Sequence, residues 1–128
     1  MSDIEIYESL DGDIRLNVQL EDETVWLTQA QIAQLFGVNS QAITKHLGNI
    51  YEEGELAADA TCSKMEQVRQ EGGRQVKRTV NVYNLDAIIS VGYRVNSRKA
   101  THFRQWATRI LKEYAVKGFA LDDRRLEG

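Results

Sequence analysis

Apolar and polar residues alternate along most of the first 27 residues, at the period of a β-strand. Ile4 and Ile6 alternate with Glu5 and Tyr7, and a second alternating run places Ile14, Leu16, Val18 and Leu20 on one side. The Asp11-Gly12 pair between the two runs is typical of a turn, so we expect a β-hairpin with one buried face. A second turn at Asp22-Glu23 and a short third strand over residues 24–27 follow.

The period of the apolar positions then changes to that of a helix. Thr28 and Gln31 have the spacing of a capping box, which predicts a helix from Thr28 to about Phe36. Gly37 is typical of a helix end, because glycine adopts the left-handed conformation at little cost. Asn39 is a suitable cap for a second helix, which we expect to end near residues 53–54.

The pattern of the second half predicts two further strands and two closing helices. Residues 62–84 favour two β-segments around residues 71–74, whereas residues 55–61 are weakly patterned. Asn84 can cap a helix over residues 85–93, and Ser97 another that reaches about Lys117 and stops at Gly118. Apolar residues recur in this last helix at intervals of three and four, namely Phe103, Trp106, Ala107, Ile110, Leu111 and Tyr114.

Residues 29–48 follow the pattern of a helix-turn-helix. Ala33 stands four residues before Gly37, where two helices would pack closely, and the expected wedge between them consists of Ile32, Val38, Ile43 and Leu47. The N-terminal half of the second helix would then enter a major groove. The residues expected to contact DNA here are Asn39, Ser40, Gln41, Thr44 and Lys45. The alternative is a pair of short packed helices that bind nothing.

The charge is distributed unevenly along the chain. Residues 1–60 carry twelve acids against two bases, a net charge of −10, whereas residues 61–128 carry a net charge of +7. Affinity for DNA comes largely from phosphate neutralisation, so the cations must come from the second half. The expected hairpin at residues 62–84 would be a basic wing, with Arg74, Lys77 and Arg78 on the DNA backbone. The alternative is a solvated hairpin. On the last helix, Arg98, Arg109 and Lys112 lie opposite the apolar side and are either phosphate contacts or the solvated side of the helix, and we favour the solvated side.

Residue patterns of catalytic and metal sites are missing from the sequence. One cysteine, Cys62, cannot build a zinc site or an internal disulfide, and neither His46 nor His102 has a partner at metal-ligand spacing. We therefore expect no enzyme activity, no cofactor and no metal, and we expect Trp26 and Trp106 to be core residues. The chain has no apolar run near 20 residues and begins with an acidic segment, so a cytoplasmic protein is expected.

Several long segments resemble the RhuM virulence-protein family of bacteria. They are Leu20–Gln31, Tyr83–Val95, Phe103–Ala107, Lys112–Tyr114 and Lys117–Phe119. The last helix, with its Phe-Arg-Gln-Trp-Ala segment, is also similar to the end of the Bro-N domain of phage antirepressors, which points to DNA binding. The resemblance to the RhuM family implies an association with virulence and carries no established reaction over to these residues.

Together these features predict one α+β domain over residues 1–128, a winged helix-turn-helix with a small N-terminal sheet and two C-terminal helices. The expected function is binding of double-stranded DNA in transcriptional or mobile-element regulation, by a homodimer. The rivals are a protein-interaction or oligomerisation module and a regulatory domain of a larger effector protein. Because the sequence stops at Leu126-Glu127-Gly128 without a natural finish, we also expect it to be a fragment of a longer protein.

Overall fold

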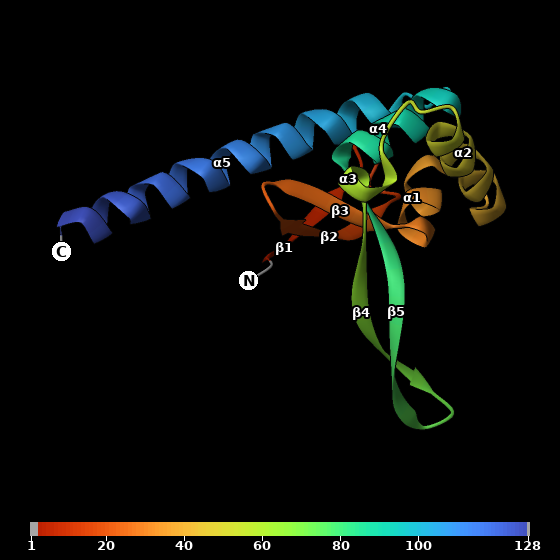
Figure 1. The fold of residues 1–128 in the computed structure, drawn as a ribbon, viewed down its shortest axis with the longest axis horizontal. Helices are drawn as coiled ribbons and strands as arrows, with labels where there is room; N and C mark the ends of the chain where they lie inside the picture. Colours follow the sequence, from red (N-terminus) through yellow and green to blue (C-terminus); the bar gives the residue numbers. More distant parts are fainter. Residues whose placement is uncertain (1–2, 128) are drawn as a thin grey trace.

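The protein is an α+β structure built on one antiparallel sheet (Figure 1). The computed structural model describes residues 3–127 and the side chains of residues 3–115. Within this part the sheet has five strands in the order β1-β2-β3-β5-β4, and five helices accompany it. The α+β class expected from the sequence is therefore confirmed.

The strands and helices lie close to the ranges that the sequence pattern predicts. The strands are β1 (Asp3–Glu8), β2 (Arg15–Glu21), β3 (Thr24–Thr28), β4 (Cys62–Glu71) and β5 (Arg74–Asn84). The helices are α1 (Gln29–Phe36), α2 (Ser40–Glu52), α3 (Ala58–Thr61), α4 (Leu85–Arg94) and α5 (Lys99–Glu127). The sequence did not predict α3, because a single helical turn is too short to show a period of 3.6 residues.

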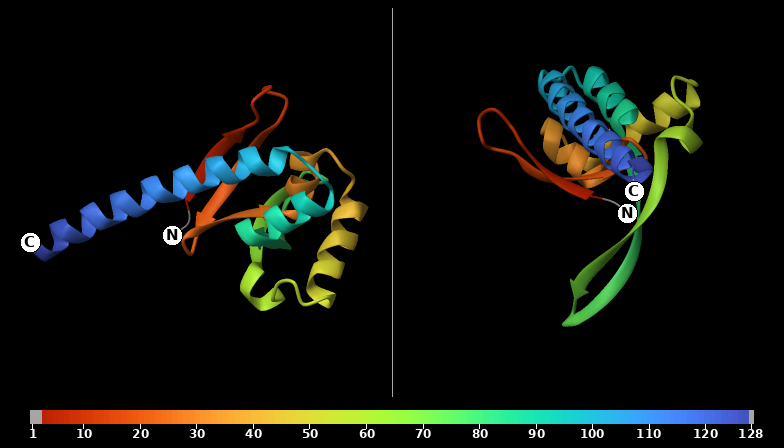
Figure 2. Two further views of the ribbon diagram at one scale, coloured as in Figure 1. Left: turned by 90° about the horizontal axis from the view of Figure 1, so that it is seen from above. Right: turned by 90° about the vertical axis from the view of Figure 1, so that its left-hand side faces the viewer.

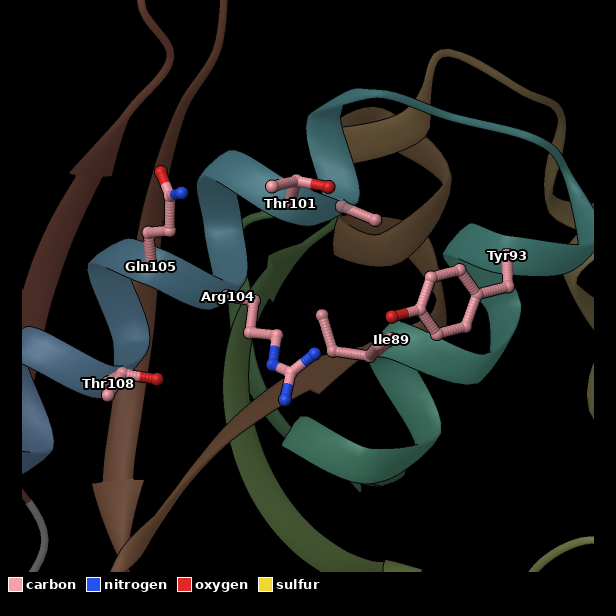
Figure 3. Close-up of a pocket in the computed structure, with 7 residues that line it drawn as sticks. Ile89, Tyr93, Thr101, Arg104, Gln105 and Thr108 are labelled. Carbon is pink, nitrogen blue, oxygen red and sulfur yellow. The ribbon is translucent and has the colours of Figure 1, made fainter.

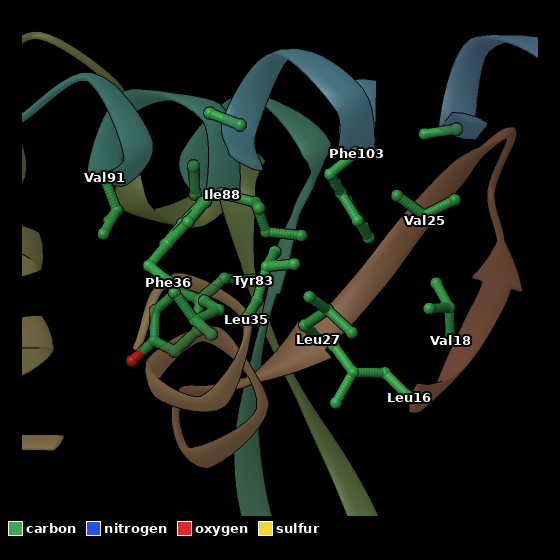
Figure 4. Packing of buried hydrophobic residues seen from close by; sticks show 14 of the residues in the cluster. Leu16, Val18, Val25, Leu27, Leu35, Phe36, Tyr83, Ile88, Val91 and Phe103 are labelled. Atoms are coloured by element: carbon green, nitrogen blue, oxygen red, sulfur yellow. The ribbon is translucent and has the colours of Figure 1, made fainter. Parts of the chain in front are cut away.

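Helices α1, α4 and α5 pack against the sheet, and α2 packs on α1 and α4 (Figure 2). The side of β2 predicted to be buried is buried, at Ile14, Leu16, Val18 and Leu20. Val25, Leu27 and Tyr83 continue this inner face across β3 and β5, where they meet residues of α1, α4 and α5 (Figure 4). This single cluster is the core that fixes the position of α1 and hence of α2.

The buried side of β1 is the opposite of the expected one. Ile4 and Ile6 are 63% and 47% exposed, whereas Tyr7 is fully buried. Tyr7 faces the inner side because its ring packs on Phe103 and Trp106 of α5, at centroid distances of 5.0 and 5.1 Å. An aromatic ring buries more apolar area than an isoleucine, and this contact with a distant helix decides which side of β1 is buried.

The last helix also differs from the expectation, since α5 continues through Gly118 to Glu127. A glycine inside a helix costs only about 1 kcal/mol, and no proline follows it. Strong helix formers flank Gly118 on the C-terminal side, including Ala120, Leu121 and Leu126. The helix therefore extends past the body of the domain (Figure 1). At its start, the Ser97 side chain accepts a hydrogen bond from the Lys99 amide at 3.2 Å, in agreement with the predicted cap.

Candidate nucleic-acid interface

Helices α1 and α2 form a compact pair whose ends are fixed by local hydrogen bonds. The capping box is present: Gln31 N donates to Thr28 Oγ1 at 3.2 Å, and Thr28 N donates to Gln31 Oε1 at 2.9 Å. Gly37 ends α1 in the left-handed conformation, with φ of 68°. Asn39 caps α2 by accepting a hydrogen bond from Ala42 N at 2.8 Å. All three predicted signals thus act where the sequence placed them.

The predicted wedge between the two helices is largely buried. Ile32 and Ile43 are fully buried, and Leu47 is 4% exposed, while Val38 is half-buried against the same cluster. Ala33 is buried, and its carbonyl accepts hydrogen bonds from both Gly37 N and Val38 N as the chain turns. A turn of three residues, 37–39, therefore sets the direction of α2 relative to α1.

The N-terminal half of α2 presents polar side chains to solvent. Ser40, Gln41, Thr44 and Lys45 are all exposed, as predicted. Asn39 is exposed too, but its side-chain oxygen is engaged as the helix cap. The structure thus brings together four side chains able to donate or accept hydrogen bonds and one capping residue next to them.

Gln29, the first residue of α1, is a functional candidate that sequence reasoning missed. Its Nε2 atom donates to the Ser40 carbonyl at 2.9 Å and to Ser40 Oγ at 3.0 Å. The same atom donates to Thr44 Oγ1. These partners are 11 and 15 residues away along the chain, so no local pattern could indicate the contact.

The β4–β5 hairpin projects away from the rest of the molecule (Figures 1 and 2). Glu71 pairs with Arg74 across a two-residue turn, Gly72-Gly73, in which both φ angles are positive. Along β4 and β5 most side chains before Val82 are exposed. This is the shape that a wing would need.

The predicted phosphate contacts are divided between the two faces of this hairpin. Alternation along the paired strands puts Arg69, Arg74 and Arg78 on one face, and Lys64 and Lys77 on the other. Arg74 and Lys77 are exposed, but Arg78 is paired with Glu71 at 3.1 Å. The three expected residues therefore do not form one contact surface, because each step along a strand reverses the direction of the side chain.

The acidic C-terminal end of α2 is partly neutralised by α4. Arg94 Nη2 pairs with Glu53 at 2.6 Å and with Glu55 at 3.1 Å. These hydrogen bonds raise the pKa of Arg94, so the guanidinium stays charged. The pair reduces the repulsion that Glu53 and Glu55 would exert on a polyanion near α2.

Two further residues that the sequence analysis singled out, His102 and Cys62, lie in the described part of the chain. His102 Nδ1 is hydrogen bonded to Tyr7 OH at 2.5 Å, and burial raises the pKa of the Cys62 thiol. In the part of the chain that the structure describes, no three His, Cys, Asp or Glu residues lie close enough to hold a metal ion. Nor does any helix in that part have the length and apolar character needed to cross a membrane.

An open groove of about 400 Å³ lies between α4 and α5. Ile89 and Tyr93 border it on α4, and Arg104 borders it on α5 (Figure 3). The other residues of α5 with polar side chains that line the groove are Thr101, Gln105 and Thr108.

Comparison with known proteins gives one match. The model of the virulence protein RhuM family matches residues 60–128, more than half of the chain. The match includes the β4–β5 hairpin, α4 and α5, whereas the Leu20–Gln31 segment lies outside it. Searches among curated proteins and among solved structures gave no significant match. The chain belongs to the virulence protein RhuM family.

Proposed function

We propose that this domain binds double-stranded DNA as part of a transcriptional or mobile-element regulator. In this proposal α1, α2 and the β4–β5 hairpin act as a winged helix-turn-helix, with α2 in the major groove and the hairpin on the backbone. The observation that carries the proposal is the exposed polar set on the N-terminal half of α2, held on α1 by a three-residue turn. Recognition helices contact base edges with this part of the helix.

The chemistry of these side chains suits base edges. Glutamine can form two hydrogen bonds with adenine, and Ser or Thr can donate to or accept from several bases. The side chain of Gln41 has no hydrogen bond to another described residue, so its amide group is available to a ligand. Lys45 can reach a base or a phosphate from the same turn of α2.

Lys45 is the only lysine or arginine in α1 and α2. Most of the affinity for DNA must therefore come from other elements. The hairpin carries five bases, Lys64, Arg69, Arg74, Lys77 and Arg78, against the acids Glu66 and Glu71. Its projection from the body supports a role in reaching the DNA backbone beside α2. Phosphate contacts of this kind would add affinity that does not depend on sequence.

Titration of binding to a random-sequence duplex against salt concentration tests the proposal. Contacts from Lys45 and the three hairpin arginines predict a slope of log K against log salt of about −4. The matched variant Lys45→Ala should reduce the magnitude of the slope by about one. Absence of binding at low salt would refute the DNA-binding proposal.

A protein-interaction or oligomerisation module is the second candidate. The net charge of −10 over residues 1–60 and the exposed Ile4 and Ile6 on edge strand β1 favour it. The same titration separates the two candidates, because an interaction module would not bind the duplex even at low salt. A regulatory domain of a larger effector protein would be compatible with either result.

A further inference from the structure

We propose that Gln29 is a specificity-determining residue that makes α2 select thymine in the major groove. The inference rests on the proposed DNA binding and adds to it the class of base that Ser40 and Thr44 read. It starts from the hydrogen bonds between the first residue of α1 and the first turn of α2.

The orientation of the Gln29 amide follows from its partners. The Ser40 carbonyl can only accept a hydrogen bond, so the group that faces it must be the amide nitrogen and not the oxygen. The same nitrogen also lies within hydrogen-bond distance of the hydroxyl oxygens of Ser40 and Thr44, so its two hydrogens are shared among three acceptors. Ser40 and Thr44 are four residues apart on α2, so both hydroxyl oxygens lie on the same side of this helix, beside the Gln29 amide.

These bonds determine what each hydroxyl can still offer to a ligand. Thr44 Oγ1 donates its hydrogen to the Ser40 carbonyl at 3.1 Å and accepts from Gln29. Its hydrogen is used, and its methyl group remains. Ser40 Oγ accepts from Gln29, and its own hydrogen has no acceptor among the described residues. The pair therefore presents one hydrogen-bond donor and one methyl group, beside the second lone pair of each hydroxyl oxygen.

Thymine is the base whose major-groove edge matches this combination. Its O4 atom is an acceptor, and its C5-methyl group makes apolar contacts with groups such as the methyl of threonine. Cytosine presents a donor, its N4 amino group, so it would leave the Ser40 hydrogen without an acceptor. Guanine and adenine provide acceptors but no methyl group. Without Gln29, the Ser40 hydroxyl can rotate, whereas Thr44 keeps its bond to the Ser40 carbonyl, so the preference for thymine should weaken at the position that Ser40 reads.

The test selects bound molecules from a pool of duplexes with a randomised core, using three forms of the chain. Wild type should enrich sites with a conserved thymine, and Gln29→Ala should bind but show weaker enrichment at that position. Gln34→Ala is the matched control. Gln34 is an exposed glutamine on the same helix, and its side chain has no hydrogen bond to another described residue. The control should select the same sites as wild type.

A second measurement uses wild type alone and does not depend on how a variant folds. Replacing the selected thymine by uracil removes only the methyl group, and loss of one buried methyl should weaken binding about fourfold. Replacing the thymine–adenine pair by a 5-methylcytosine–guanine pair keeps the methyl group but replaces the acceptor on this base with a donor, and should weaken binding further.

The outcomes separate this inference from the proposed function. If wild type binds the duplex but Gln29→Ala enriches the same bases as strongly, or if uracil binds as well as thymine, the inference is wrong while DNA binding stands. Binding without any base preference would also overturn it. If wild type binds no duplex, the proposed function fails, and the inference fails with it.

Discussion

Tyr7 connects the first strand to the last helix. Its side chain is fully buried, its ring contacts two aromatic residues of α5, and its hydroxyl is hydrogen bonded to His102. Burial, followed by the negative charge of Asp11, raises the pKa of Tyr7 to about 12. A neutral Tyr7 is therefore part of the folded state.

The raised pKa predicts a loss of stability at alkaline pH. An unfolded tyrosine releases its proton near pH 10, so between about pH 10 and 12 the folded chain binds more protons than the unfolded one. The free energy of unfolding should fall as pH rises through this range, by up to about 3 kcal/mol from Tyr7. Urea denaturation at pH 8, 10 and 11 measures this fall in the free energy of unfolding.

Tyr7→Phe provides the comparison. Loss of the hydrogen bond to His102 should lower its stability at pH 8 by about 1 kcal/mol. Its stability should then fall less steeply than that of wild type above pH 10. Burial also raises the pKa values of Tyr51 and Tyr83, so some loss remains in both proteins. Parallel losses in the two proteins would show that Tyr7 is not the group responsible.

Replacing either of two helical glycines by alanine should have opposite effects on the stability of the protein. A Cβ atom at Gly92 would lie 2.5 Å from the Cβ of Ala100 and 3.0 Å from Cζ of Phe36. Gly92→Ala should therefore destabilise the protein by about 1–3 kcal/mol through overpacking between α4 and α5. A Cβ at Gly48 on α2 would meet no atom within 4 Å, so Gly48→Ala should stabilise it by about 0.5–1 kcal/mol. Equal unfolding midpoints for the two variants would contradict the close approach at Gly92.

At the scale of elements, the hairpin and α2 differ in how they are supported. The α2 helix packs on α1 and α4, whereas the outer part of the hairpin has only its own partner strand. Its side chains can therefore be changed with little effect on the core. The hairpin is thus the element in which charge can be tested separately from folding.

The division of charge over the two hairpin faces predicts unequal effects of two double variants. Arg69→Ala with Arg74→Ala removes two bases from the arginine face, and Lys64→Ala with Lys77→Ala removes two from the other. Because arginine binds phosphate with two hydrogen bonds, we expect the arginine pair to weaken binding to specific and random DNA alike. The magnitude of the salt slope should fall by about two for this pair and change little for the lysine pair. An unchanged salt slope in both double variants would contradict the proposed contact between the hairpin and the DNA backbone.

At the scale of the whole molecule, the long apolar stripe of α5 is satisfied within the chain. Phe103, Trp106, Ala107 and Ile110 are buried against the sheet and neighbouring helices. Burial of these four residues therefore does not require a second copy of the chain. The apolar surface that remains open includes Ile4 and Ile6 on the outer side of β1.

We still predict a homodimer, because one helix-turn-helix contacts a short site and twofold pairing supplies the second half-site. Light scattering should give a mass that rises with concentration toward twice 14.6 kDa. Ile4→Lys with Ile6→Lys should reduce this association, while Val68→Lys, at an exposed hairpin position, should not. A constant monomer mass over a wide concentration range would refute the dimer.

Local signals in the sequence determined most of the elements. The capping box at Thr28, the left-handed Gly37 and the Asn39 and Asn84 caps act through hydrogen bonds within a few residues, so they can be recognised without the fold. The alternation in β2 and the apolar spacing in α5 likewise indicate a buried side wherever the core lies. The predicted base-reading residues follow from the same helix boundaries.

Only the tertiary structure decided the features that depend on residues far apart in the chain. The side of β1 that is buried depends on Tyr7 meeting α5, and the role of Gln29 depends on the approach of α1 to α2. In both cases the contact joins segments far apart in the chain, so the packing of distant side chains decides the outcome, and no single segment of the sequence contains it.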